Sequence, residues 1–360
     1  MTLEVVDGDA HVVEGSEFII QLMEAFPDKL SFPPAGDGVR GALIEGRPYP
    51  NSSGPGAGVD AATSLTREAS NPFEPQGVLA DADREGIGAM VLYPSLGIAT
   101  TSFRDRVFAR EFARRYNRWV SRYCAVAAGR LHGVGVVPLQ DVDAAVAMLP
   151  EIKGLGLVAV TVPPALGDRN LDHPSLDPFF AGAAAAGLPV SVHGAPGMHV
   201  PTPGADRFDN YVQVHCVSFP FDQMVALTAL VFGGVLERHP RLRVAFLEAG
   251  VGWVPYFVER MDEHFEKRGS QVPGCKRPPS EYVARGQCYF SCEPEEQGIA
   301  MACASIGGEW IMYASDYPHW DSDFPNTVAP IRERSDLSAE AKAKILGGNA
   351  RRFYGLNGAR

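Results

Sequence analysis

The sequence has few of the patterns that mark secreted, membrane-spanning or nucleic-acid-binding proteins. Its first residues contain neither a basic n-region nor an apolar h-region, and no stretch approaches the ~18 uninterrupted apolar residues of a membrane helix. The chain of 360 residues carries a formal net charge of -11 and has no basic run, so we expect no nucleic-acid partner and no membrane partner. Six cysteines without a CxxC pair favour reduced thiols in a cytoplasmic protein.

Neither of the common nucleotide-binding motifs, G-x-G-x-x-G and G-x-x-x-x-G-K-[ST], follows the first apolar run. The sequence does contain eight short apolar runs, most of them bounded by Gly, Pro or Asp, as is typical of strands buried on both faces. They lie at 3–6, 89–93, 133–138, 157–162, 190–193, 244–248, 288–292 and 310–314. Helical patterns between them include 106–127, 142–152, 177–186, 221–238, 252–266 and 339–353. This alternation predicts an α/β fold of the (β/α)₈ TIM-barrel class.

Two long segments depart from a minimal barrel and predict a distorted one. The segments at about 26–76 and 194–211 are rich in glycine and proline, and they follow the first and fifth predicted strands. Loops of this length are usually lids, binding loops or oligomer arms. We therefore expect both at the catalytic mouth of a single domain, 1–360, that forms a homodimer or a larger homo-oligomer.

The first predicted strand ends in a cluster of acidic residues and a histidine. Asp7, Asp9 and His11 alternate along this strand, so they are expected on one face, directed toward the mouth of the barrel. A carboxylate and an imidazole two residues apart can both reach one metal ion. An Asp-x-His pair alone also occurs in structural hydrogen bonds.

Two further strand ends carry metal-binding residue types. The fifth predicted strand ends at His193, and Asp316 follows the eighth. An aspartate in that position can also cap a helix. Three separate strands that end in nitrogen and oxygen ligands nevertheless favour a metal centre formed by Asp9, His11, His193 and Asp316.

These motifs together resemble those of the amidohydrolase superfamily. The set D-x-H, V-H-G and A-S-D-Y-P-H is most similar to the branch that contains aminocarboxymuconate semialdehyde decarboxylase and the resorcylate-type decarboxylases. The segments EAGVGWVPY, at 248–256, and ILGGNARRFY, at 345–354, also resemble that branch. The resemblance extends over nearly the whole chain.

The resemblance implies a role for each residue of the cluster. His11 and His193 would be metal ligands, and Asp9 takes a place that many relatives give to His or Glu. Asp316 would be a ligand that is also near enough to handle protons. We expect one divalent ion, Zn²⁺ first and Mn²⁺ as the alternative, because a mixed nitrogen and oxygen ligand set suits either ion. The expected partner is a small-molecule carboxylic acid.

The chain departs from the decarboxylase pattern at the sixth strand. Relatives usually carry a histidine there that acts as an acid or base, and this chain has Glu248. His215, which precedes that strand, is a candidate for the missing imidazole. His319, just after Asp316, is expected at the mouth, around the ligands or on the surface. Asp316, His215 and Glu248 are therefore the predicted acid–base residues.

The reaction we expect is the metal-dependent, non-oxidative decarboxylation of an aromatic or unsaturated carboxylic acid. The alternative is a metal-dependent hydrolase that cleaves an amide, a lactone or a C–C bond, and Glu248 favours it. A barrel that binds a ligand without turnover is the third hypothesis.

Overall fold

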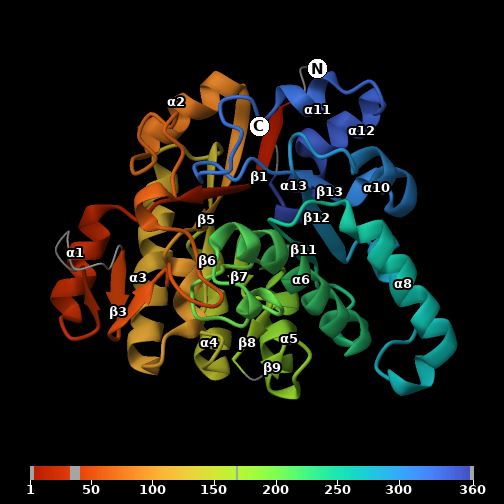
Figure 1. Ribbon diagram of the computed structural model, residues 1–360, viewed down its shortest axis with the longest axis horizontal. Helices are drawn as coiled ribbons and strands as arrows, with labels where there is room; N and C mark the ends of the chain where they lie inside the picture. Colours follow the sequence, from red (N-terminus) through yellow and green to blue (C-terminus); the bar gives the residue numbers. More distant parts are fainter. Residues whose placement is uncertain (1–3, 33–40, 168, 357–360) are drawn as a thin grey trace.

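The structure is a computed structural model that describes residues 4–32, 41–167 and 169–356. Its centre is a curved sheet of eight parallel strands, joined in sequence order with β1 and β13 at its two ends (Figure 1). The strands are β1 (Val5–Val12), β5 (Ile87–Pro94), β6 (Leu131–Val136), β7 (Ala159–Val162), β10 (Val190–Val192), β11 (Val244–Phe246), β12 (Cys288–Cys292) and β13 (Ile311–Tyr313). Each overlaps one of the eight predicted apolar runs, so the TIM-barrel prediction is confirmed.

The two ends of the sheet meet at the catalytic mouth, which makes the barrel nearly closed. The backbone N–H of His11 donates to the carbonyl oxygen of Tyr317 at 2.6 Å, and that of Asp316 donates to the carbonyl oxygen of Asp9 at 3.0 Å. These bonds fasten the segment that follows β13 to β1. As a result, the predicted ligands Asp9 and His11 lie beside Asp316, although about 300 residues separate them in the sequence.

Helices surround the strands and bury their apolar faces against them. The helices are α1 (Ser16–Ala25), α2 (Pro75–Glu85), α3 (Arg106–Ala125), α4 (Val142–Gly154), α5 (Asp177–Ala186), α6 (Tyr211–Phe232), α7 (Val235–Arg238), α8 (Trp253–Arg268), α9 (Pro279–Ala284), α10 (Ile299–Ile306), α11 (Ala329–Glu333), α12 (Ala339–Ala343) and α13 (Asn349–Tyr354). In α3, the Asp105 carboxylate caps the first turn, and Phe108, Phe112 and Tyr116 are buried at helical spacing.

The interior of the barrel is filled at the end opposite the mouth. Alternate strand side chains form a small inner cluster, which also includes Phe353 and Tyr354 of α13. The Tyr354 hydroxyl donates to the carbonyl oxygen of Gly8 at 2.6 Å. Since aromatic residues of the last helix occupy this part of the interior, the carboxyl ends of the strands form the open end.

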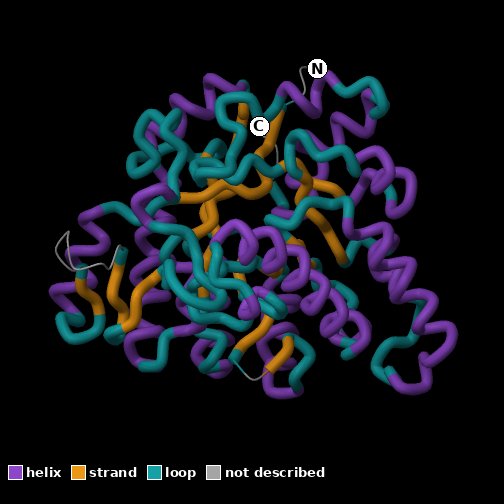
Figure 2. The backbone as a smooth tube through the Cα atoms, in the orientation of Figure 1, coloured by secondary structure: helices purple, strands orange, loops and turns teal. Residues whose placement is uncertain are grey.

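The first insertion, predicted as a loop at about 26–76, contains regular structure. It forms a three-stranded antiparallel sheet of β2 (Leu30–Ser31), β3 (Ala42–Ile44) and β4 (Arg47–Tyr49), and α2 begins at its end. The part of the predicted loop at 33–40 lies outside the described residues. Figure 2 shows these short strands apart from the barrel strands, on the side where Figure 1 labels α1.

The second insertion, 194–211, is irregular until α6 begins at Tyr211. The predicted start of this helix at 221 is wrong by ten residues: Pro220 interrupts the pattern in the sequence, but the structure keeps it inside α6. The Asn210 side chain caps the first turn by accepting from the N–H of Val212. His215 consequently lies on the first turns of α6, and not in a loop before the sixth strand.

The two insertions contact each other above the mouth. The N–H of Asn51 donates to the carbonyl oxygen of Gly197 at 2.8 Å, and Nε2 of His199 lies 2.8 Å from the carbonyl oxygen of Pro48. Both segments also line the large cavity described below. The prediction that they border the catalytic mouth is confirmed.

Among the described residues, α6 is the one helix long and apolar enough to cross a membrane by length and composition. Its most apolar window is 56% buried within the protein. Buried polar residues, including Asp222 and Gln223, lie along it. This is the burial expected of a helix in a protein core.

Candidate metal centre

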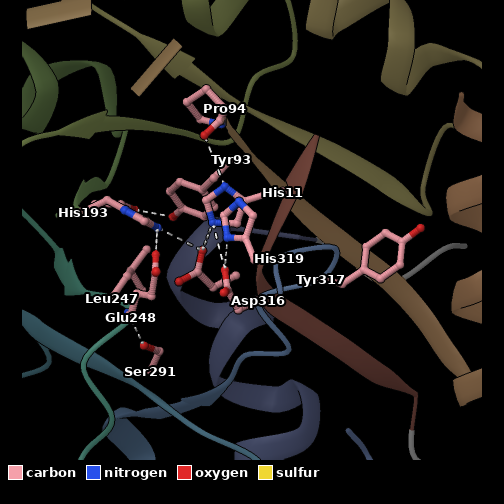
Figure 3. Close-up of polar contacts among 12 residues, drawn as sticks. His11, Tyr93, Pro94, His193, Leu247, Glu248, Ser291, Asp316, Tyr317 and His319 are labelled. Atoms are coloured by element: carbon pink, nitrogen blue, oxygen red, sulfur yellow. Dashed lines mark hydrogen bonds and ion pairs between the residues drawn. The ribbon is translucent and has the colours of Figure 1, made fainter. Parts of the chain in front are cut away.

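The predicted ligands converge at the carboxyl ends of three strands (Figure 3). Nε2 of His11 lies 3.3 Å from Oδ1 of Asp316 and 3.8 Å from Oδ1 of Asp9, and Nε2 of His193 lies 3.9 Å from the same Asp9 oxygen. All four residues are buried. The structure therefore brings together the four residues that the sequence predicts as a metal centre.

Backbone carbonyl groups orient the two imidazoles. Nδ1 of His11 lies 3.2 Å from the carbonyl oxygen of Pro94, and Nδ1 of His193 lies 2.7 Å from that of Gly194. With the ring proton on Nδ1 donated to these carbonyls, the lone pair of each Nε2 is directed toward the centre. Such a bond on the far nitrogen is the usual way in which proteins fix a metal-binding histidine.

Several polar atoms at the centre are buried without a hydrogen-bond partner among the described residues. They are Asp9 Oδ1, His11 Nε2, His193 Nε2, Glu248 Oε2 and Asp316 Oδ2. An unpartnered buried polar atom costs about 1–3 kcal/mol. A divalent cation would satisfy the atoms of Asp9, His11, His193 and Asp316, and two imidazoles with carboxylates are a suitable donor set for a first-row metal ion.

Asp7 does not join this cluster. The pairing of β1 with β5 shifts register between Asp7 and Ala10, and the Asp7 carboxylate accepts from both the N–H and the hydroxyl of Ser315. Burial raises the pKa of Asp7 to about 7, which these hydrogen bonds oppose. Asp7 thus holds Ser315 in place. The next residue, Asp316, has a backbone φ of 53°.

Glu248 lies directly beside the predicted ligands. Its Oε2 is 2.9 Å from Nε2 of His193, and its N–H donates to the Ser291 hydroxyl at 3.0 Å. The residue has a φ of 54°, a conformation that few non-glycine residues adopt. Burial raises the pKa of Glu248 well above its ordinary value, and the charge of Asp321 adds to this effect.

His215 reaches the centre from the helix α6. Its Nε2 lies 3.3 Å from Oδ2 of Asp321, and ligand atoms of His215, Asp321 and Glu248 all lie within 4.8 Å of one another. Burial lowers the pKa of His215, and Asp321 opposes this shift. The three acid–base residues predicted from the sequence, Asp316, His215 and Glu248, thus lie around one centre.

Two residues of the site were not among the sequence-predicted site residues. Nδ1 of His319 lies 2.7 Å from Oδ1 of Asp316, and its ring centroid is 4.1 Å from that of His11. Burial lowers the pKa of His319 to about 4. Asp321 is the partner of His215. The signal for both was their place three and five residues after Asp316. Tyr317, between Asp316 and His319, points away from the cluster (Figure 3), and its hydroxyl donates to Asp81 at 2.8 Å.

A cavity of about 640 Å³ opens from this centre. His11, His193, Glu248 and His319 line its polar part, and apolar side chains of α1, of both insertions and of α6 line the remainder. No lysine or arginine is among the described residues that line it. A metal centre at one end of an apolar cavity suits a substrate with one polar group and a hydrophobic body.

Comparisons with known proteins agree with this geometry. The chain is 27% identical over 296 residues to 2-amino-3-carboxymuconate-6-semialdehyde decarboxylase from Dictyostelium discoideum, which covers 80% of this chain and 78% of that protein. It is 28% identical over 290 residues to gamma-resorcylate decarboxylase from Rhizobium sp. (strain MTP-10005), which covers 77% of this chain and 86% of that protein.

Solved structures share the fold over almost their whole length. An amidohydrolase from Mycobacterium avium subsp. paratuberculosis K-10 superposes with a TM-score of 0.79 at 21% identity, over 98% of this chain and 100% of that one. A 5-carboxyvanillate decarboxylase from Novosphingobium aromaticivorans, with bound manganese and a nitrobenzoic acid, superposes with a TM-score of 0.74 at 18% identity, over 98% of this chain and 97% of that one. The family model described as amidohydrolase matches residues 6–356. The chain therefore belongs to the amidohydrolase family.

Proposed function

We propose that this protein is a metal-dependent, non-oxidative decarboxylase of an aromatic or unsaturated carboxylic acid. The observation that carries the proposal is the group of buried carboxylate oxygens and imidazole nitrogens without hydrogen-bond partners. These atoms lie at the inner end of an apolar cavity. The curated relatives, both named as decarboxylases of unsaturated or aromatic acids, support the same reaction.

Asp9, His11, His193 and Asp316 would hold one divalent ion. The donor set fits Zn²⁺, which we propose first, and Mn²⁺, which a structural neighbour contains. When bound, the ion supplies a Lewis acid that attracts the substrate carboxylate and stabilises negative charge. None of the described residues that line the cavity is a lysine or arginine, so none of these competes for that carboxylate.

Decarboxylation breaks the bond between the ring carbon and the carboxylate carbon. The electron pair stays on the ring carbon, which must then receive a proton. His215, with Asp321 at 3.3 Å, and Glu248 flank the mouth of the centre as donors for this proton. Asp316, with His319 at 2.7 Å, is the third group that can hold or pass it.

A hydrolase of the same family is the second candidate function. The observation that favours it is Glu248, a carboxylate placed 2.9 Å from His193 at the position where the resemblance leads one to expect a histidine. A carboxylate suits the role of a base that takes a proton from water during cleavage of an amide, a lactone or a C–C bond.

The test is an activity screen on protein reconstituted with Zn²⁺ or Mn²⁺. Aromatic and unsaturated acids are assayed for CO₂ release, and ester, lactone and amide panels for hydrolysis. For a decarboxylase, the product made in D₂O carries deuterium at the carbon that lost CO₂. Hydrolysis without CO₂ release from any acid would replace the first proposal with the second.

We also propose that residues 1–360 form a single domain, that the protein assembles as a homodimer or larger homo-oligomer, and that it works in the cytoplasm. Two observations support the first two points. One continuous barrel includes elements from both ends of the chain, and both insertions lie at the mouth, where a partner subunit can reach them. Light scattering on the purified protein measures the assembly.

A further inference from the structure

One face of α1 forms a wall of the cavity. Ser16, Ile19, Ile20 and Met23 all line it, at the spacing i, i+3, i+4 and i+7 that places side chains on one side of a helix. Seven residues of α-helix advance about 10 Å. Because α1 follows β1 after a short turn, the cavity extends from the barrel mouth along two turns of this helix.

Exposed apolar side chains gather on the same cavity. Ten large hydrophobic residues are exposed in the described part of the chain, and four of them line it: Ile20, Phe32, Phe73 and Trp320. Ile20 is 53% exposed. Scattered exposed hydrophobic residues are ordinary, but a group of them around one cavity marks a binding site for apolar material.

The charged groups among the described lining residues gather at the barrel mouth, apart from Glu14 just before α1, whose carboxylate accepts from the N–H groups of Leu96 and Gly97. The carboxylates of Glu248 and Asp321 and the imidazoles of His215 and His319 are beside the metal centre. Along the α1 wall, Ile19, Ile20 and Met23 offer no hydrogen-bond donor or acceptor side chain. Burial of a charged group without a partner is costly, so this stretch of the cavity is suited to an uncharged part of a ligand.

The cavity is also much larger than one aromatic ring requires. A closed cavity of about 150 Å³ is enough to bind benzene, whereas this one measures about 640 Å³. A ring held by its carboxylate at the metal centre would leave most of the apolar wall bare. The unused part is the stretch beside α1.

We propose that the substrate carries an uncharged apolar extension, an alkyl chain or a second ring, that lies along the α1 face of the cavity. Its acid group would bind at the metal centre, and this orientation rests on the proposed function. The extension itself rests on the cavity. The substrate class is then a hydrophobic-tailed aromatic or unsaturated carboxylic acid, and not a small monocyclic acid.

The experiment measures binding by calorimetry, with a series of 2-hydroxybenzoates that carry no alkyl group, a propyl group or a hexyl group. The metal-reconstituted protein is used throughout. Each buried methylene adds roughly fourfold in affinity, so we expect a gain of at least about a hundredfold from the parent acid to the hexyl member. A hexyl analogue with a terminal carboxylate should lose most of this gain.

Substitutions on the helix decide whether the gain arises along α1. Ile20→Trp fills the outer stretch and should weaken binding of the hexyl member about tenfold or more, while the parent acid changes less than about twofold. Val107→Trp, at another exposed aliphatic residue that does not line the cavity, is the matched control and should change neither affinity.

Affinity that is flat across the series, or an equal effect of both tryptophan substitutions, would overturn the proposed extension. The proposed reaction is tested separately by CO₂ release. Affinity that rises with chain length in a protein that decarboxylates no acid supports the extension and contradicts the reaction. CO₂ release together with an affinity that does not change along the series supports the reaction and contradicts the extension.

Discussion

Oε2 of Glu248 lies 2.9 Å from Nε2 of His193, so a buried carboxylate stands beside a proposed metal ligand. Glu248→Gln keeps the shape of the side chain and removes its charge and its acid–base function. If Glu248 transfers a proton, turnover should fall by about 10²–10⁴-fold. The assay is turnover of the best substrate, together with metal content by atomic emission, which should stay unchanged because Glu248 is outside the proposed ligand set.

The matched control for this prediction is Glu259→Gln on an exposed position of α8. It should leave turnover unchanged. Loss of metal from the Glu248 variant would show that this carboxylate is a ligand and contradict its assignment as an acid–base group.

His193→Ala tests the metal centre itself. The wild-type protein should bind about one divalent ion per chain, and the variant should bind close to none, because one of two imidazoles is removed from a small ligand set. Added Zn²⁺ or Mn²⁺ should raise the melting temperature of the wild type and leave that of the variant unchanged, since only a protein that binds the ion gains stability from it.

His264→Ala, on the exposed side of α8, is the control, and it should keep both metal binding and the metal-dependent rise in melting temperature. Circular dichroism checks that both variants are folded. Full metal occupancy in His193→Ala would exclude His193 as a ligand.

His215→Asn separates the two candidate reactions. In a decarboxylase that uses His215 as its proton donor, turnover should drop by roughly two orders of magnitude or more while metal content is retained. A nearly silent His215→Asn combined with an inactive, metal-loaded Glu248→Gln would favour the hydrolase. Asp321→Asn should reproduce part of the His215 effect, because Asp321 lies 3.3 Å from the imidazole.

The barrel and the cluster of proposed metal ligands were largely predictable from the sequence because each depends on local pattern. Buried parallel strands leave continuous apolar runs, and the barrel topology places every strand end at one mouth. Asp9 and His11 lie in β1, and His193 and Asp316 follow β10 and β13, so knowledge of the fold is enough to bring them together.

Other parts of the site depend on contacts that no local pattern carries. Pro220 made the first turns of α6 look like loop, and this hid the helix that positions His215. The sequence allowed three alternative places for His319, because its contact with Asp316 depends on how the chain turns after β13. The register shift that separates Asp7 from Asp9 likewise has no signature in a run of alternating residues.

Gln223 on α6 offers a test of how the site is held in place. Its side-chain amide donates to the carbonyl oxygens of Val192 at 3.1 Å and of Leu247 at 2.8 Å, the residues directly before His193 and Glu248. Gln223→Leu leaves the Leu247 carbonyl without this donor, which should cost about 1–3 kcal/mol of unfolding free energy. Metal affinity should fall about tenfold, the lower end of the range for groups that orient ligands.

Thr228→Val, which removes a side-chain hydrogen bond to the Met224 carbonyl oxygen within the same helix, is the control for Gln223. It should leave metal affinity unchanged. If Gln223→Leu lowers stability but not metal affinity, its role is structural only.

Asp222 supplies a prediction about pH. The residue is fully buried on α6, and both of its carboxylate oxygens lack a hydrogen-bond partner among the described residues. Burial raises the pKa of Asp222 to about 8, whereas an aspartate in the unfolded chain has a pKa of about 3.9. Between these values the folded state holds a proton that the unfolded state has lost. Stability from this residue is therefore complete below about pH 4 and falls as the pH rises toward 8.

Asp222→Asn cannot ionise, so its unfolding free energy relative to that of the wild type should grow from pH 5 to pH 8 and then level off, because above that pH the folded wild-type carboxyl is also ionised. Urea denaturation at one-unit pH steps measures this difference. Asp206→Asn, at an exposed aspartate, is the control and should differ from the wild type by a nearly constant amount. A constant difference for Asp222→Asn as well would mean that the Asp222 carboxylate is ionised in the folded protein and has a partner there, since only a stabilised charge keeps a buried aspartate at its ordinary pKa.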